Sequence, residues 1–162
     1  MDEAEVLIQH LTEQGKKAVL AESCTAGMAA DLMARIPGAS QVLWGSFVCY
    51  TAEAKIAMLG LDPRRLAAHG LVSSETACDM ASAALAKSGA DIAAAVTGIA
   101  GPGGDGSGIP AGTVWIAVAL RAQAPDAMLY HFSGSRSEVR SQAARVVIKE
   151  LLKALQKPLL SS

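Results

Sequence analysis

The stretch KAVLAESCTAGMAADLMARI, residues 17–36, decides the fold. It opens with a mostly apolar run that has the composition of a short buried strand, and helical spacing follows over residues 27–35. Three small polar residues, Ser23, Cys24 and Thr25, lie between the two elements. A strand that leads directly into a helix is the unit from which layered α/β folds are built. The stretch therefore predicts an α/β protein.

The same alternation continues along the chain and ends in a hairpin. Runs rich in apolar and β-branched residues predict four further strands, over residues 41–50, 91–98, 112–120 and 128–134. Helical spacing predicts further helices over residues 4–14, 51–61, 62–69, 73–89 and 137–157, the last ended by Pro158. Helices between the early strands, and a short loop between the last two, predict a three-layer α/β/α fold around a mixed, mostly parallel five-stranded sheet.

Length and composition fit one ordinary globular domain, residues 1–162. Hydrophobic residues make up 51% of the chain and aromatic residues only 4%, which suits alanine-rich helices packed closely against a sheet. The net charge of −1 disfavours a general nucleic-acid binder, because such proteins carry an excess of basic side chains. An anionic ligand would have to be held by a local group of donors.

No segment has the pattern of a membrane span, a secretory signal or a metal site. The most apolar uncharged run, residues 36–52, is broken by glycine and proline and falls short of the roughly 20 residues that a spanning helix needs. The acidic N-terminus lacks the basic-then-apolar layout of a signal, so we expect a cytoplasmic protein. The three cysteines and three histidines have neither disulfide-framework nor metal-ligand spacing.

Ser23 is the first candidate nucleophile, because it leaves a strand just before a helix N-terminus. Backbone N–H groups and the helix dipole at such a place stabilise a developing oxyanion or a bound anion. Ser23 and Thr25 are equally typical of helix caps, and on this stretch alone capping is the commoner role. Cys24 is the rival nucleophile, provided that a neighbouring base or helix end activates its thiol.

Tyr50 and Lys55 are candidates for the base that a serine hydroxyl needs. A partly desolvated lysine accepts the hydroxyl proton, and a tyrosine relays or donates one. The alternative is that Lys55 is a solvated helix lysine and Tyr50 an aromatic residue at the sheet edge.

A glycine-rich loop and two arginines form a second set of candidates. The segment from Thr97 to Gly112 contains seven glycines and two prolines, and such a loop lets backbone N–H groups converge on a phosphate or carboxylate. It is neither a P-loop nor a GxGxxG motif, and a plain connection is the alternative. Arg136 and Arg140 share one helical face and suit a phosphate, although a solvated charged face is commoner.

Six motifs follow one another along the chain: ESCTAG, YTAEAK, LVSSETA, ADIAAAVTGIAGPGG, PAGTVWIAV and GSRSEVR. In this order they resemble the CinA C-terminal domain family, from about Lys17 to Leu155. The sequence is most similar to the stand-alone members, which are nicotinamide-nucleotide amidases. The resemblance implies hydrolysis of the carboxamide of nicotinamide mononucleotide (NMN) to nicotinate mononucleotide and ammonia, in pyridine-nucleotide salvage, without a metal or an organic cofactor.

The resemblance also implies a role for individual residues. Ser23 of ESCTAG is the nucleophile, and Tyr50 and Lys55 of YTAEAK activate it. Residues expected to bind the substrate are Thr25, Gly27, Thr97, Gly98, Ala100, Gly101, Arg136 and Arg140.

Two positions depart from the family pattern, since many members have glycine where this chain has Ala26 and Ser46. A methyl group at position 26 matters if φ is positive there or if the substrate touches the backbone. The alternative function is therefore a non-catalytic nucleotide-binding or regulatory CinA-like module. Alanine-rich helices and apolar strand edges are also compatible with a homodimer.

Overall fold

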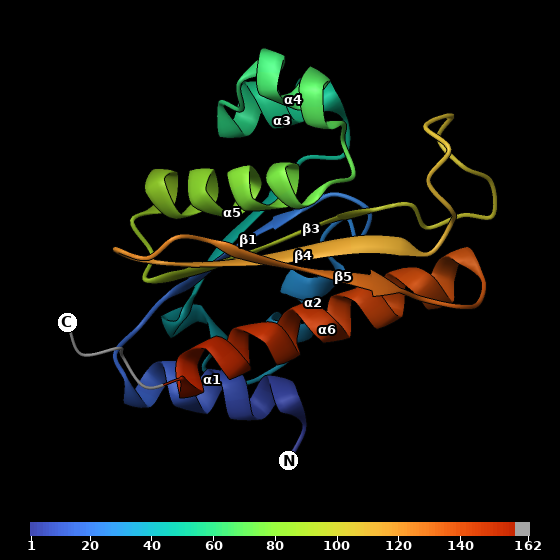
Figure 1. The fold of residues 1–162 in the computed structure, drawn as a ribbon. Coiled ribbons are helices and arrows are strands. Elements are labelled where there is room, and N and C mark those ends of the chain that lie inside the picture. The colour runs from blue at the N-terminus through green and yellow to red at the C-terminus, as the bar shows by residue number, and fades with distance from the viewer. Residues whose placement is uncertain (158–162) are drawn as a thin grey trace.

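The computed structural model describes residues 1–157 and contains one five-stranded sheet between two layers of helices (Figure 1). The strand order across the sheet is β2-β1-β3-β4-β5. The strands are β1 (Ala18–Glu22), β2 (Leu43–Val48), β3 (Ile92–Gly98), β4 (Thr113–Leu120) and β5 (Asp126–His131). The predicted α/β/α class and the five predicted strands are confirmed.

The sheet is mixed, as predicted. β1 pairs in parallel with both β2 and β3, whereas β4 is antiparallel to β3 and to β5. β4 is thus the one strand of the five that runs against the others. The short β4–β5 connection produces the hairpin, and the longer connections that precede it carry helices.

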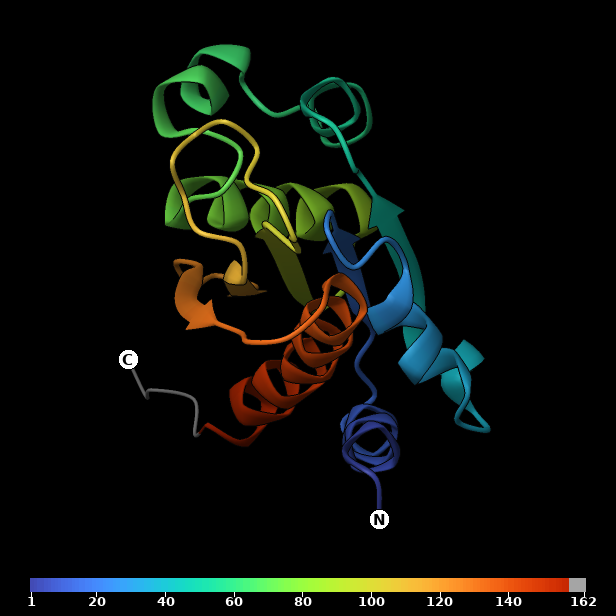
Figure 2. The same ribbon diagram turned by 90° about the vertical axis from the view of Figure 1, so that its right-hand side faces the viewer.

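Helices cover both faces of the sheet (Figures 1 and 2). On one face lies α5 (Ser74–Ser88), with α3 (Ala52–Leu59) and α4 (Pro63–His69) packed beyond it. On the other face lie α1 (Glu3–Glu13), α2 (Met28–Ala34) and α6 (Arg136–Gln156), and a short 3-10 turn, Ala39–Gln41, precedes β2. The predicted helices are confirmed with ends shifted by one or two residues, and Pro158 lies outside the described residues.

The sheet separates two hydrophobic cores. Along β3, Ile92, Ala94 and Val96 face the core under α1, α2 and α6, while Ala93 and Ala95 face the core under α5. Alternate side chains of a strand point to opposite faces, so one strand serves both cores. Alanines on both the sheet and α5 allow this helix to pack close to the strands, as the alanine-rich composition suggested.

Side-chain caps explain most helix starts. Thr51, Asp62 and Ser73 each accept a hydrogen bond from a backbone N–H in the first turn of α3, α4 and α5. The predicted capping of α2 by Ser23 or Thr25 is wrong: the N-cap position is Gly27, which has no side chain to accept a bond. The N–H groups at the start of α2 are satisfied in another way, described below.

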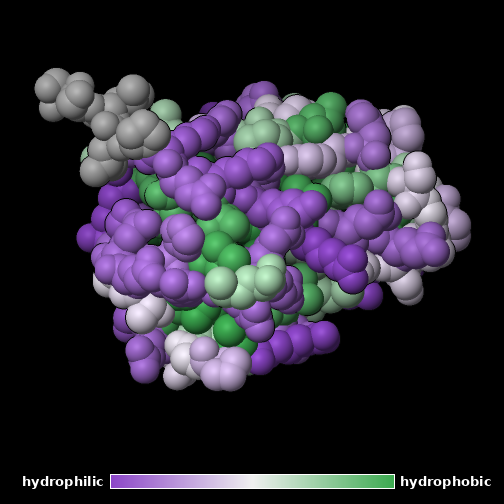
Figure 3. All heavy atoms as spheres, turned by 90° about the horizontal axis from the view of Figure 1, so that it is seen from below, coloured by the Kyte–Doolittle hydropathy of each residue, from purple (hydrophilic) through white to green (hydrophobic). Residues whose placement is uncertain are grey.

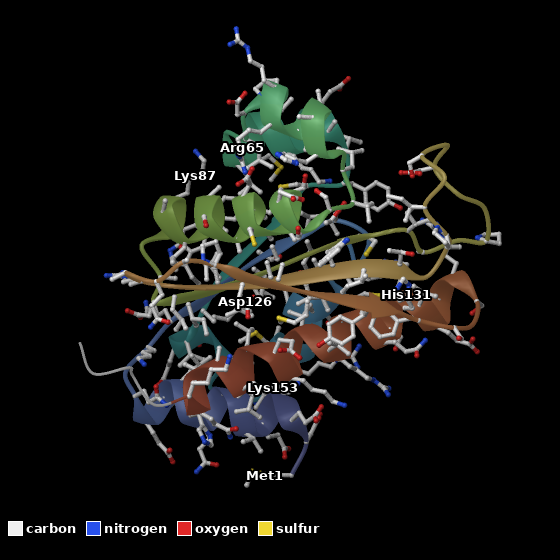
Figure 4. The ribbon with its side chains drawn as sticks, viewed as in Figure 1. Met1, Arg65, Lys87, Asp126, His131 and Lys153 are labelled. Carbon is white, nitrogen blue, oxygen red and sulfur yellow. The ribbon has the colours of Figure 1, made fainter. Side chains whose placement is uncertain are left out.

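The surface over α1 and α6 is mostly hydrophilic, with apolar side chains showing between polar ones (Figure 3). Within residues 1–157, none of the helices combines the length and the apolar character that a membrane crossing requires. Ion pairs between elements lie at the surface, and in one of them Arg65 on α4 (labelled in Figure 4) pairs with the partly exposed Asp79 on α5, with 2.9 Å between Nε and Oδ2. Such pairs contribute little to stability.

Candidate active site

Segments from distant parts of the sequence meet at the carboxyl ends of β1 and β3 (Figure 2). They are the turn after β1, the segment from the end of β2 into α3, the glycine-rich loop between β3 and β4, and the start of α6. A pocket of about 240 Å³ lies among them. Ligands of open α/β sheets bind beyond the carboxyl ends of the strands, so this pocket is the candidate active site.

Ser23 and Lys55 form a buried pair in the wall of this pocket. Lys55 Nζ donates to Ser23 Oγ at 2.9 Å and to the carbonyl oxygen of Cys49 at 3.0 Å. Ser23 is 7% exposed and Lys55 only 1%. Lys55 is therefore not the solvated helix lysine of the alternative interpretation.

The sheet and one helix cap place both partners. The N–H of Ser23 donates to the carbonyl of Val96 on β3 at 3.0 Å, which holds the serine just beyond the end of β1. Thr51 caps α3 by accepting the N–H of Ala54 and sets Lys55 in the first turn. Because β1 and β2 are parallel neighbours, α3 begins beside the turn that carries Ser23.

Burial acts differently on the two candidate reactive groups. It lowers the pKa of the Lys55 amine, because the ammonium form loses its hydration. A neutral amine accepts a proton, so this shift suits a general base. Burial raises the pKa of the Cys24 thiol to about 11, which leaves little thiolate near neutral pH. Charge and geometry together favour Ser23 over Cys24 as the nucleophile.

The turn after Ser23 offers backbone donors. The Ala26 N–H donates to the carbonyl of Ser23 at 3.1 Å, whereas the N–H groups of Cys24 and Thr25 have no acceptor from another residue in the described part of the chain. Cys24 also lines the pocket. Backbone N–H groups beside a nucleophile are common donors to the oxyanion of acyl transfer.

Ala26 has a φ of 48°, in the left-handed region that glycine adopts more readily. This is the condition under which the departure from the family pattern matters. The strain does not break the contact between Ser23 and Lys55, which keeps its 2.9 Å distance.

Tyr50 lines the pocket but its hydroxyl contacts neither Ser23 nor Lys55. The hydroxyl oxygen accepts a hydrogen bond from Nη2 of Arg136 at 2.6 Å, and Nη1 of the same guanidinium donates to the carbonyl of Gly101 at 2.9 Å. Tyr50 is 51% exposed, so it has room to move. The bridge links three segments that border the pocket, and a proton-relay role for Tyr50 stays a prediction.

The other predicted substrate-binding residues fall into two groups. Thr97, Gly98, Ala100 and Gly101 line the pocket together with Arg136. The remaining residues lie outside the lining, and their contact with a substrate stays a prediction: Thr25, Gly27 and Arg140.

Within these groups, packing already explains several positions. The Thr97 hydroxyl donates to the carbonyl of Leu71 at 2.8 Å. A Cβ at Gly98 would lie 2.7 Å from the carbonyl oxygen of Thr113, so β4 leaves no space for a side chain there. Arg140 donates through Nε to the carbonyl of Cys24 at 2.9 Å and through Nη2 to that of Thr25 at 3.2 Å.

Sequence reasoning missed Glu22, the last residue of β1, which is completely buried beside Ser23. Its carboxylate accepts four hydrogen bonds, from Thr25 Oγ1 (2.8 Å), the N–H of Ala29 (2.8 Å), the N–H of Ala30 (3.3 Å) and Ser46 Oγ (2.7 Å). The missing cap of α2 is therefore this carboxylate. A charged residue inside an otherwise apolar strand was the available signal.

Sheet topology and pocket together define an α/β protein with a buried serine–lysine pair at the carboxyl ends of parallel strands. Residues 2–155 match the family model described as the CinA C-terminal domain. The chain belongs to this family.

Relatives and solved structures agree with this assignment. The chain is 44% identical over 153 residues to a "Putative competence-damage inducible protein" of Lacticaseibacillus casei. The match spans 94% of this chain but 37% of that protein. A "CinA-like protein" of Akkermansia muciniphila is 40% identical, with 93% of this chain and 36% of that protein covered. The chain thus spans little more than a third of the length of these relatives.

The similar solved structures have nearly the same length as this chain. A CinA superfamily protein from Klebsiella pneumoniae superposes with a TM-score of 0.91 at 33% identity, covering 94% of this chain and 95% of that one. The competence/damage inducible protein CihA from Agrobacterium tumefaciens gives 0.88 at 38% identity, with 97% and 98% covered. These structures share the α/β/α fold described above.

Proposed function

We propose that this protein is a serine amidohydrolase that converts NMN to nicotinate mononucleotide and ammonia. The observation that carries the proposal is the 2.9 Å contact between Ser23 Oγ and a Lys55 amine whose pKa burial lowers. An amide is a poor electrophile, so its hydrolysis needs an activated nucleophile, donors to the oxyanion and an acid for the departing nitrogen. Each need has a candidate group in this pocket.

The proton path follows from the pair. Neutral Lys55 takes the hydroxyl proton as Ser23 Oγ attacks the carboxamide carbon, and the carbonyl oxygen becomes an oxyanion beside the Cys24 N–H. Collapse of the tetrahedral intermediate breaks the C–N bond, and the Lys55 ammonium returns its proton to the nitrogen, which leaves as ammonia. Water then attacks the acyl-serine, with Lys55 as base, and releases the carboxylate.

The substrate class rests on the surroundings of the pair. Arg136 is the guanidinium that lines the pocket, and it suits a phosphate group once it exchanges its bond to Tyr50 for one to the ligand. Gly101, Gly103 and Gly104 bring backbone close to the same space without side chains. A phosphorylated nicotinamide would then present its carboxamide to Ser23, which lines the same pocket.

Ammonia release from nicotinamide, its riboside and its mononucleotide tests both reaction and substrate. We expect turnover of the mononucleotide with the wild-type protein, none with Ser23→Ala, and nearly full activity with the matched variant Cys24→Ala. Loss of activity in Cys24→Ala alone would point to a thioester. Binding of NMN by calorimetry without any ammonia would support the non-catalytic module instead.

A further inference from the structure

Two charged side chains hold the turn that carries Ser23. Glu22 binds its C-terminal end, through the hydroxyl of Thr25 and the first N–H groups of α2. Arg140, from α6, binds its middle, through the carbonyls of Cys24 and Thr25. Neither residue hydrogen-bonds Ser23 itself.

The bonds of Arg140 fix peptide orientation. A trans peptide is planar, so a carbonyl and the N–H of the next residue point in opposite directions. When Arg140 holds the carbonyl of Cys24, the N–H of Thr25 must point away from the guanidinium. The Ser23 carbonyl accepts from Ala26 at 3.1 Å, which fixes the Cys24 N–H by the same argument. Within the turn, the N–H groups of Cys24, Thr25 and Gly27 have no acceptor from another described residue. Of these three residues Cys24 lines the pocket, whereas Thr25 is completely buried.

Glu22 fixes where the turn ends. Its buried carboxylate accepts hydrogen bonds from two N–H groups of α2 that would otherwise be unpaired, and a hydrogen bond donated to a carboxylate is stronger than one between neutral groups. Ser46 on the neighbouring β2 donates to the same carboxylate at 2.7 Å, which ties the arrangement to the sheet. α2 therefore cannot shift along the sheet without breaking several hydrogen bonds to one buried charge.

The charges around the turn also favour an anion. Arg140 and Lys55 both lower the pKa of the Cys24 thiol and Glu22 raises it, with Arg140 the largest of the three influences. The electrostatic field at Cys24 thus stabilises negative charge although a buried carboxylate lies nearby. Burial outweighs this field for the thiol, but a transient oxyanion held by N–H groups uses the same field.

We propose that Glu22 and Arg140 are positioning residues that hold the turn after Ser23, so that its Cys24 N–H serves as an oxyanion donor in the Ser23 reaction; this inference rests on the proposed amidase function. In this proposal Arg140 holds the turn that carries Ser23, and Arg136 is the arginine that binds the phosphate. Neither Glu22 nor Arg140 need touch the substrate in this arrangement.

The first test separates positioning from substrate binding by steady-state kinetics with NMN. Arg140→Lys keeps the charge but loses the two-carbonyl fork, and we expect kcat to fall about tenfold with KM within twofold of wild type. Arg145→Lys, an exposed position on the same helix, is the matched control and should change neither constant. A rise in KM at unchanged kcat in Arg140→Lys would overturn the inference in favour of phosphate binding.

Glu22→Gln and Ser46→Ala extend the series on the other side of the turn. Glu22→Gln removes the charge and one acceptor oxygen, and we expect a fall in kcat of about tenfold. Ser46→Ala removes one of the four donors to Glu22, and should lower kcat two- to threefold while the protein stays folded. Unchanged kcat in folded Ser46→Ala and Glu22→Gln would refute the role of Glu22.

A second measurement does not depend on the substrate. Amide ¹H–¹⁵N spectra of Arg140→Lys should show shifted Cys24 and Thr25 resonances with at least tenfold faster hydrogen exchange, and unchanged ones in Arg145→Lys. If the amide resonances shift in Arg140→Lys but the wild-type protein releases no ammonia, the amidase function is refuted and the positioning of the turn by Arg140 is retained. Unshifted Cys24 and Thr25 amide resonances in Arg140→Lys would refute the positioning of the turn by Arg140, whatever the activity.

Discussion

Replacement of Lys55 by methionine tests the serine–lysine pair most directly. Methionine has a similar length and apolar stem, so it fills the buried site while removing the amine that contacts Ser23. Loss of a general base typically lowers rates by about 10²–10⁴-fold, and we expect a fall in kcat/KM in this range. In the wild type, kcat/KM should rise with pH through the lowered pKa of Lys55, since only the neutral amine accepts the proton.

The same substitution has a pH-dependent effect on the free energy of unfolding. Two hydrogen bonds are lost, to Ser23 Oγ and the Cys49 carbonyl, at about 1 kcal/mol each. Between the lowered pKa of folded Lys55 and the ordinary value of 10.5, the unfolded chain binds a proton that the folded chain does not. Wild-type stability therefore gains up to about 1.4 kcal/mol per pH unit in this window as pH rises.

Lys55→Met lacks this gain. Relative to the wild type, the free energy of unfolding of the variant should therefore be highest at low pH and lowest at high pH. Urea unfolding at several pH values from 6 to about 10 measures the difference, with Lys87→Met, an exposed lysine on α5 (Figure 4), as control. A stability difference that does not change with pH, together with kcat/KM within threefold of wild type, would refute the reasoning.

Three further predictions concern the neighbouring residues. Ala26→Gly relieves a φ of 48° and should raise the free energy of unfolding by up to about 1 kcal/mol in urea titrations, and a loss of stability would contradict the strain. Gly98→Ala places a Cβ 2.7 Å from the Thr113 carbonyl oxygen and should cost about 1–3 kcal/mol in the same measurement. Tyr50→Phe removes the acceptor of Arg136 and should change KM for NMN more than kcat; a hundredfold fall in kcat would instead place Tyr50 in the proton path.

The fold was predictable because each element has a local signal. The apolar runs of β1 and β3 and the caps Thr51 and Asp62 act within a few residues of themselves, and the structure keeps them. The cap of α2 was mispredicted for the opposite reason. Its acceptor is Glu22, seven residues before the N–H of Ala29 and in another element, outside the range of the usual capping pattern.

The burial of Lys55 is equally invisible to a local reading. The segment YTAEAK does not show which face of its short helix is buried. The residues alone therefore left a solvated lysine as the alternative to a base, and the family motif favoured the base. Its burial depends on the parallel pairing of β1 with β2, which sets α3 beside the Ser23 turn. Likewise, the four-residue spacing of Arg136 and Arg140 predicted a shared face, yet Arg136 lines the pocket while Arg140 binds the turn beneath it.

Ala26 and Ser46, the two departures from the family pattern, have opposite effects on the stability of the turn after Ser23. Ala26 holds a left-handed conformation that costs about 1 kcal/mol relative to glycine, and it lies between the N–H groups and the start of α2. Ser46 adds a hydrogen bond to Glu22, worth about 1 kcal/mol, at a position where a glycine has no donor. The bond from Ser46 ties β2 to the same carboxylate that caps α2, and its contribution is similar in size to the cost of the Ala26 conformation. With both residues in place, Lys55 Nζ lies 2.9 Å from Ser23 Oγ.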